Sequence, residues 1–334
     1  MENSHNHIRL TSAEIGHLWS SYLFETSVHH MFRYFLVHVD DPDIERFVEQ
    51  CLRTSKRHVH RYMDIFKKEQ FPVPRGITSE DINTKAPRLF SDVFYLHYID
   101  GMAKFALNGF ALAVAEVSRK DVREVFHLHI DALQEITEMG KRLLLEKGLY
   151  SRPPYITTPK QVDFVESGHF FAGFTIDKRP LTVFEMNQLF QNVRSNSLGK
   201  ALLKGFMQVT DDKKLCAYFE KGKSLANKYV TTFSTILLKE DCNVPSTYGS
   251  EVLDSSVSPF SNRFMLNHVT HLISYGTANY GLSMALSPRK DLALMYLKVI
   301  GEVMTYAGEG AKLLTKHGWM EQPPTKSDAK NCKD

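Results

Sequence analysis

Residues 10–38 read LTSAEIGHLWSSYLFETSVHHMFRYFLVH, and this stretch decides the fold class. It begins with Thr11 and Glu14 in a Thr-x-x-Glu capping box, in which the two side chains satisfy free amides at a helix start. Apolar side chains then recur at steps of three and four and share one helix face with two ionisable groups. The members of this face are Leu18, Tyr22, Glu25, His29, Phe32 and Leu36. The stretch therefore predicts a long helix whose buried stripe is interrupted by a carboxylate and an imidazole.

The same opening recurs 171 positions later, as Leu181-Thr182-Val183-Phe184-Glu185. Other segments recur at offsets of 170 or 171. The pairs are Asp40-Asp41 with Asp211-Asp212, Pro74 with Pro245, Phe90-Ser91 with Phe260-Ser261, Arg119-Lys120-Asp121 with Arg289-Lys290-Asp291, Gly148 with Gly318, and Pro153-Pro154 with Pro323-Pro324. These pairs predict a tandem duplication. The halves are long for solenoid repeats, so we expect two complete domains, residues 1–158 and 159–334.

Each half carries four long helical patterns, which in the first half cover about residues 11–38, 42–69, 88–117 and 119–147. Short turns join the first pattern to the second and the third to the fourth. About 18 residues, from Gln70 to Pro87, separate the second from the third, and the link from Asn243 to Pro259 is similar. When extended, such a link reaches about 60 Å, whereas a helix of about 27 residues is about 40 Å long. The sequence thus predicts an all-α fold of two tandem ferritin-like four-helix bundles, each with a long crossover between helices 2 and 3. An up-and-down bundle with a floppy loop is the alternative.

The segment between the halves, residues 157–179, contains Phe170, Phe171 and Phe174. It is too aromatic for a free linker. We therefore expect it to pack into the seam between the two bundles.

Ionisable side chains lie on or beside the inner faces of all four helices in the first half. They are Glu25, His29, His58, His97, Asp100 and His129. With the crossover, those on the first and third helices fall within roughly 6 Å of one another along the axis, and His58 shares a lower level with His129. Imidazole and carboxylate groups that converge between helices build metal sites, commonly for iron or manganese, and a histidine-rich set also suits zinc. The six residues are therefore candidate metal ligands.

The pattern departs from the usual di-iron one, because Ser55-x-x-His58 stands where Glu-x-x-His is expected. A hydrogen-bonded polar core without metal is the alternative interpretation. The second half has lost every candidate ligand: the equivalent residues are Asn196, Lys200, Tyr229, Asn267, Thr270 and Val299. Any metal site is therefore expected in the first bundle alone.

Composition narrows the function classes. The chain has 334 residues, 43% hydrophobic and 24% charged, which is typical of a globular protein. A net charge of +3 without a basic stripe argues against nucleic acid as a partner. We see no signal peptide and no stretch of about 18 uncharged apolar residues that would span a membrane. Four scattered cysteines fit a reducing compartment, so a cytoplasmic location is expected.

Several segments of the second half resemble a known family. They are Arg179-Pro180-Leu181-Thr182, Leu198-Gly199-Lys200-Ala201-Leu202, Pro259-Phe260-Ser261, Asn279-Tyr280-Gly281 and Gly318-Trp319-Met320-Glu321. Together they resemble the bacterial ferritin-like family of unknown function numbered 3231, found in endospore formers. The resemblance covers nearly the whole chain. It implies two bundles in tandem, related in fold to coat-F spore coat proteins, and it implies no particular reaction.

Two functions remain as alternatives. One is a ferritin-like protein that binds iron, manganese or zinc inside the first bundle. The other is a non-catalytic structural or interaction protein of the spore or sporulating cell. The partners that remain open are further copies of the chain, in a homo-oligomer, or spore coat proteins, and the resemblance adds spore association to the expected location.

Overall fold

The computed structural model describes residues 8–174 and 178–326. These residues form eight α-helices and three short 3-10 turns, with two isolated β-bridges as the only strand-like pairing among them. The first bundle contains α1 (Ser12–His38), α2 (Pro42–Lys68), α3 (Asp92–Glu116) and α4 (Lys120–Glu146). The second contains α5 (Val183–Val209), α6 (Lys213–Leu238), α7 (Asn262–Ala285) and α8 (Lys290–Lys316). The predicted all-α fold of two four-helix bundles is confirmed.

Both predicted capping boxes are present, and the first one joins two helices. Thr11 and Glu14 cap the start of α1 reciprocally. The other carboxylate oxygen of Glu14 accepts hydrogen bonds from the backbone amides of Ser118 and Arg119, at 3.1 and 2.8 Å. One buried carboxylate therefore satisfies free amides at the starts of α1 and α4 together.

Contacts between helices establish the order of the bundle. Tyr62 packs on Phe126 and His58 stacks on His129, so α2 runs antiparallel to α4. The short turn after Glu116 makes α3 antiparallel to α4 as well. Helices α2 and α3 are therefore parallel, and residues 69–91 must return along the bundle. This is the predicted long crossover.

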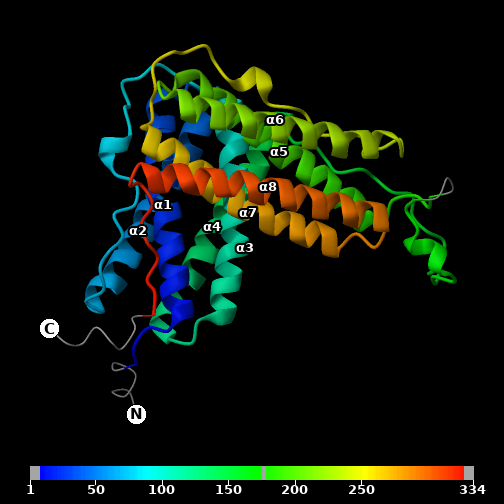
Figure 1. Cartoon of the computed structure of the whole chain (residues 1–334), viewed down its shortest axis with the longest axis horizontal. Coiled ribbons are helices and arrows are strands. Elements are labelled where there is room, and N and C mark those ends of the chain that lie inside the picture. The colour runs from blue at the N-terminus through cyan, green and yellow to red at the C-terminus, as the bar shows by residue number, and fades with distance from the viewer. Residues whose placement is uncertain (1–7, 175–177, 327–334) are drawn as a thin grey trace.

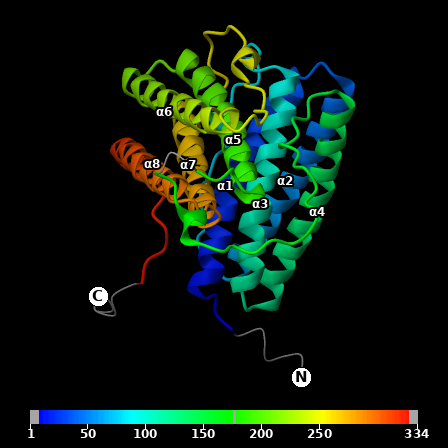
Figure 2. The same ribbon diagram turned by 90° about the vertical axis from the view of Figure 1, so that its right-hand side faces the viewer.

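The second bundle lies across the first, and the helix axes of the two bundles cross steeply (Figures 1 and 2). The two crossovers pair with each other at this junction. Ser91 N donates to Glu251 O at 3.0 Å, and the equivalent bond runs from Ser261 N to Asp81 O at 2.8 Å. Leu253 N donates to Leu89 O, and Asn83 N donates to Pro259 O. Because each bond has its counterpart 170 residues away, the halves are related by an internal pseudo-twofold axis.

The hydrophobic core is continuous across this junction. Phe35 and Tyr98 of the first bundle belong to the same buried cluster as Phe206 and Phe264 of the second. His268, at the position equivalent to Tyr98, hydrogen-bonds the Tyr98 hydroxyl in the interior. Helices α1, α3, α5 and α7 therefore pack on both their own bundle and the other one.

The expectation that the segment between the halves fills the seam is wrong. Val162 and Phe164 are 85% and 86% exposed, and Phe174 is exposed as well. Only Phe170 is held, by Arg179, whose guanidinium lies over its ring. The two crossovers hydrogen-bond each other at the junction, whereas the segment between the halves runs to the far end of the second bundle, where α5 begins (Figure 1).

Replacing the shared cap should destabilise the fold. We expect Glu14→Ala to lower the free energy of unfolding by about 2–4 kcal/mol, because three amides at two helix starts, including the buried one of Arg119, lose their charged acceptor. Urea denaturation followed by circular dichroism measures this. Glu138→Ala, on the exposed face of α4, is the matched control and should change the value by less than about 0.5 kcal/mol. Equal effects of the two variants would contradict this role for Glu14.

Candidate functional site

Three of the six predicted residues meet inside the first bundle. His58 Nδ1 lies 2.9 Å from Glu25 Oε1, and the rings of His58 and His129 stack with centroids 3.6 Å apart. Tyr62, one turn after His58, places its hydroxyl 2.7 Å from His129 Nδ1. All four side chains are buried. Helices α1, α2 and α4 thus bring one carboxylate, two imidazoles and one phenol into a single polar cluster.

Each imidazole of this cluster uses one nitrogen and leaves the other free. The Nε2 atoms of His58 and His129 are buried and have no hydrogen-bond partner among the described residues. Metal-binding histidines are commonly oriented by a carboxylate that hydrogen-bonds one ring nitrogen and leaves the other free for the metal, as Glu25 does with His58. However, an imidazole donates its lone pair within the ring plane, and stacked rings direct their lone pairs along separate planes. Both nitrogens can therefore reach one ion only if the rings turn apart.

The other three predicted residues lie elsewhere. His29, half-buried, bonds Ser55 Oγ through Nδ1 at 3.0 Å. His97 is on the side of α3 that faces the second bundle, where its Nδ1 lies 3.4 Å from the Tyr248 hydroxyl. Asp100 faces the same way and binds Lys104 and Arg194. The structure therefore places three of the six residues in the interior of the first bundle, His29 at a half-buried position between α1 and α2, and His97 and Asp100 at the seam.

Burial disfavours the charged form of three histidines, His29, His97 and His129. It lowers the pKa of His129, and the neighbouring His58 adds to the effect. Burial, followed by the charge of Arg194, lowers the pKa of His97 to about 4. Burial also lowers the pKa of His29 to about 4. Burial would raise the pKa of the Asp100 carboxyl, but Lys104 and Arg194 outweigh it and hold that pKa below its usual value.

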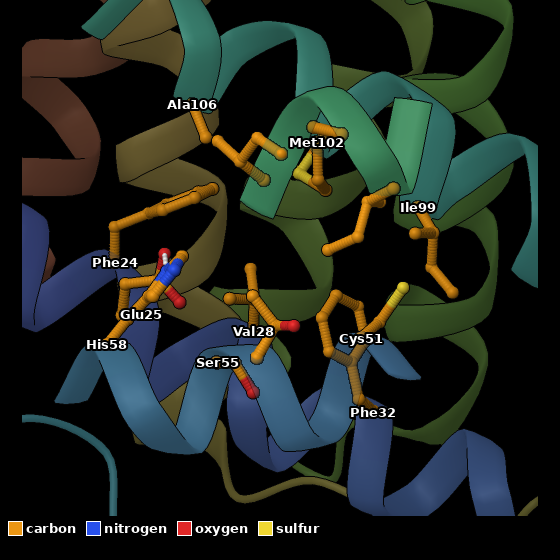
Figure 3. Close-up of a pocket in the computed structure, with 14 residues that line it drawn as sticks. Phe24, Glu25, Val28, Phe32, Cys51, Ser55, His58, Ile99, Met102 and Ala106 are labelled. Carbon is orange, nitrogen blue, oxygen red and sulfur yellow. Dashed lines mark hydrogen bonds and ion pairs between the residues drawn. The ribbon is translucent and has the colours of Figure 1, made fainter. Parts of the chain in front are cut away.

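A small cavity of about 30 Å³ lies beside the Glu25–His58 pair (Figure 3). Its walls are mostly apolar, with Phe24 and Phe32 from α1, Cys51 from α2 and Met102 from α3. Across residues 8–174 and 178–326, no group of three or more His, Cys, Asp or Glu side chains is arranged to hold a metal ion. In this structure the cluster thus offers two free nitrogen donors and a volume on the scale of one water molecule.

A much larger cleft, of about 560 Å³, opens in the second bundle and reaches the seam. Leu198, Leu202 and Leu225 are among its apolar walls, and Asn192 and Asn196 are among its amides. Three cations line it: Lys104 from α3, Lys141 from α4 and Arg194 from α5. No Asp or Glu is among its lining residues. The volume is in the range of sites for small organic molecules.

The cleft and the small cavity occupy equivalent places in the two halves. At offsets of 171 for the first two helices and 170 for the last two, each of the 14 residues around the small cavity corresponds to a residue that lines the cleft. Glu25 corresponds to Asn196, and His58 to Tyr229. Eight of the pairs replace a larger side chain by a smaller one: Phe24 by Ser195, Glu25 by Asn196, Val28 by Gly199, Phe32 by Leu203, Cys51 by Gly222, Ile99 by Val269, Ala106 by Gly276 and Leu133 by Val303. Four others, such as Ala103 with Ile273, go the other way or exchange polarity.

The chain belongs to the family of proteins of unknown function DUF3231, which matches it twice, over residues 2–162 and 169–332. The chain is similar in structure to a protein described as a spore coat protein of Bacillus halodurans C-125, and the two sequences are 17% identical. The match covers 46% of this chain and all of that chain, with a TM-score of 0.42. No curated protein matches the chain. Among the described helices, none is both long and apolar enough to cross a membrane.

The buried His129 should make the stability fall in acid. Folded His129 stays neutral, whereas the unfolded chain takes up a proton below about pH 6.5. Its contribution is therefore complete above pH 6.5 and is lost as the pH falls. We expect the pair Tyr62→Phe with His129→Val, which installs the equivalent Phe233 and Val299, to reduce the slope of unfolding free energy between pH 6.5 and 5 by about 1 kcal/mol per pH unit.

Urea denaturation at several pH values measures that slope. Tyr62→Phe alone retains the imidazole and serves as the control, with a slope close to that of the unchanged chain. An unaltered slope in the double variant would show that His129 is already protonated in the folded protein or is accessible to solvent.

Proposed function

We propose that this protein binds a small, largely apolar molecule in the cleft of its second bundle. The observation that carries the proposal is the equivalence of the 14 positions: the sites that enclose about 30 Å³ in one half help to line, together with further residues of both bundles, about 560 Å³ in the other. Both halves keep equivalent caps and crossovers, and the lengths of equivalent helices are the same or differ by one residue. The two halves differ in the side chains at the centre of the bundle and in how closely equivalent helices pack, with α5 and α6 drawn together and α6 and α8 less so. The proposal assigns binding and names no reaction.

Two glycines give the cleft much of its room. A Cβ atom built on Gly199 or on Gly276 meets nothing within 4 Å, so larger side chains at these positions would project into open space. A mid-helix glycine costs about 1 kcal/mol of stability relative to alanine. Two such residues beside a hollow are unfavourable for folding alone and favourable for admitting a ligand.

Filling the cleft should block binding without harming the fold. We expect the neutral probe N-phenyl-1-naphthylamine to gain fluorescence on entering the cleft of the unchanged protein. Gly199→Leu and Gly276→Leu should each weaken its binding by about tenfold or more, while melting temperatures stay the same or rise, because leucine favours the helix. Fluorescence titration and thermal denaturation measure both effects.

Gly301→Leu is the matched control, since Gly301 is also mid-helix, exposed, and open around its Cβ but lies outside the cleft. It should leave probe binding unchanged. Absence of probe binding to the unchanged protein, or equal binding by all three variants, would remove the proposal.

A metal ion on the first bundle is a second candidate function. It is favoured by the two buried Nε2 atoms, because an unpartnered buried polar atom costs about 1–3 kcal/mol. His58 and His129 would supply the nitrogen donors, and Glu25 and Tyr62 would orient them. Zinc, iron or manganese on such donors would supply Lewis acidity or redox chemistry. His29, His97 and Asp100 are too differently placed to complete this set without rearrangement.

Metal analysis tests this second candidate. We expect protein prepared without chelators and then supplied with zinc, iron or manganese to retain about one ion per chain. His58→Ala with His129→Ala should abolish retention, whereas His60→Ala, at an exposed position of α2, should not. Only trace metal in the reconstituted protein would contradict it and leave the polar cluster as a structural network.

A further inference from the structure

The cations of the cleft are gathered where the first bundle meets α5. Asp100 Oδ2 accepts hydrogen bonds from Lys104 Nζ at 2.8 Å and from Arg194 Nη2 at 2.5 Å. Lys141 lies close enough for its charge to lower the pKa of Lys104, after burial and Arg194. His97 beside them is neutral at pH 7, because its pKa is lowered to about 4. Three positive charges thus share one negative charge.

Two of these cations are only partly exposed to water, whereas Lys141 is exposed. The side chain of Arg194 is 12% exposed and that of Lys104 is 38% exposed. Placing the partly buried Lys104 and Arg194 there is unfavourable unless anions neutralise them, and Asp100 supplies a single negative charge for the two. This cation cluster, formed by Lys104, Lys141 and Arg194, therefore retains an excess of positive charge that an anionic group entering the cleft would balance.

The rest of the cleft has a different character. Leu272 and Ile273 from α7 and Val303 from α8 line its body, together with leucines of α5 and α6. Three of the amides there are hydrogen-bonded to neighbouring side chains: Asn279 Nδ2 donates to Asn192 Oδ1 at 2.8 Å, and Asn196 Oδ1 accepts from the Tyr280 hydroxyl at 2.9 Å. The body consequently offers apolar surface, and the free charge is concentrated near the seam.

We infer that the ligand of the cleft is an organic anion with an apolar body, whose acidic group lies between Lys104, Lys141 and Arg194. This inference rests on the proposed binding function and adds the chemical class of the ligand. A carboxylate and a phosphate monoester share the required chemistry. Charge-assisted hydrogen bonds from lysine and arginine hold the acid, and the burial of the apolar body supplies the remaining affinity.

Competition between matched ligands tests the class. Decanoate, decan-1-ol and decyltrimethylammonium carry the same chain and differ in their head group. We expect decanoate to displace N-phenyl-1-naphthylamine at about tenfold lower concentration than decan-1-ol, with the cation weakest. Decyl phosphate added to the series distinguishes a phosphate ligand from a carboxylate, because the group that fits the cluster better displaces the probe at the lower concentration.

Substitutions in the cation cluster test whether these side chains hold the acidic group. Lys104→Met and Lys141→Met should each narrow the ratio between the decanoate and decan-1-ol affinities by about fivefold or more. Lys312→Met removes the same charge from the exposed surface of α8 and should leave the ratio unchanged. Circular dichroism confirms that each variant is folded before its affinities are compared.

The outcomes separate this inference from the function on which it rests. If the probe binds and Gly199→Leu blocks it, but decanoate and decan-1-ol compete equally, the binding function stands and the anionic class is wrong. The same conclusion follows if Lys312→Met narrows the ratio as much as Lys104→Met does. If the probe does not bind the unchanged protein, both are overturned.

Discussion

The hydrogen bonds between the two crossovers are the constraint on which the rest of this structure depends. A crossover of more than 20 residues could take many paths, and each would bring the second bundle to a different place. Pairing of Asp81 with Ser261 and of Ser91 with Glu251 joins the crossovers across the pseudo-twofold axis. The bundles then cross instead of stacking end to end, so α3 faces α5 and α1 faces α7. The cleft opens along the first of these two contacts.

In this crossed arrangement, the centres of the two bundles depart from close apolar packing in opposite ways. The first fills its centre with polar groups, and Glu25, His58 and His129 must be desolvated to fit. The second leaves its centre hollow. At about 24 cal/mol per Å³, a dry void of 560 Å³ would cost roughly 13 kcal/mol, which equals the whole stability of an ordinary domain. The hollow must therefore be open to water or ligand, and its amides and cations are what allow water to enter. Departures of this kind are expected where a fold serves a function.

Much of this could be predicted from local signals. The capping boxes at Thr11 and Thr182 and the length of the crossovers carry the fold, because both follow from backbone hydrogen bonding and chain reach. The inner line of α2 is amphipathic and places His58 correctly. On α3 both sides are apolar, since one faces the first bundle and the other faces the second. Periodicity therefore could not say that His97 and Asp100 belong to the seam.

The cleft was missed because Gly199, Gly222 and Gly276 carry no chemistry of their own. Comparing side-chain volumes at equivalent positions of the two halves was the signal that could have found it.

The position of the cleft also gives a physical reason for keeping both bundles in one chain. Lys104 and Lys141 come from the first bundle, while most of the apolar body of the cleft comes from the second. In a symmetric dimer of identical bundles, any residue that opens one cavity opens the other, and any cation placed on one rim appears on both. Fusion of the two copies removes this restriction. One half can then retain full side chains and supply the rigid, charged wall, while its duplicate loses volume from the same positions and becomes the receptor.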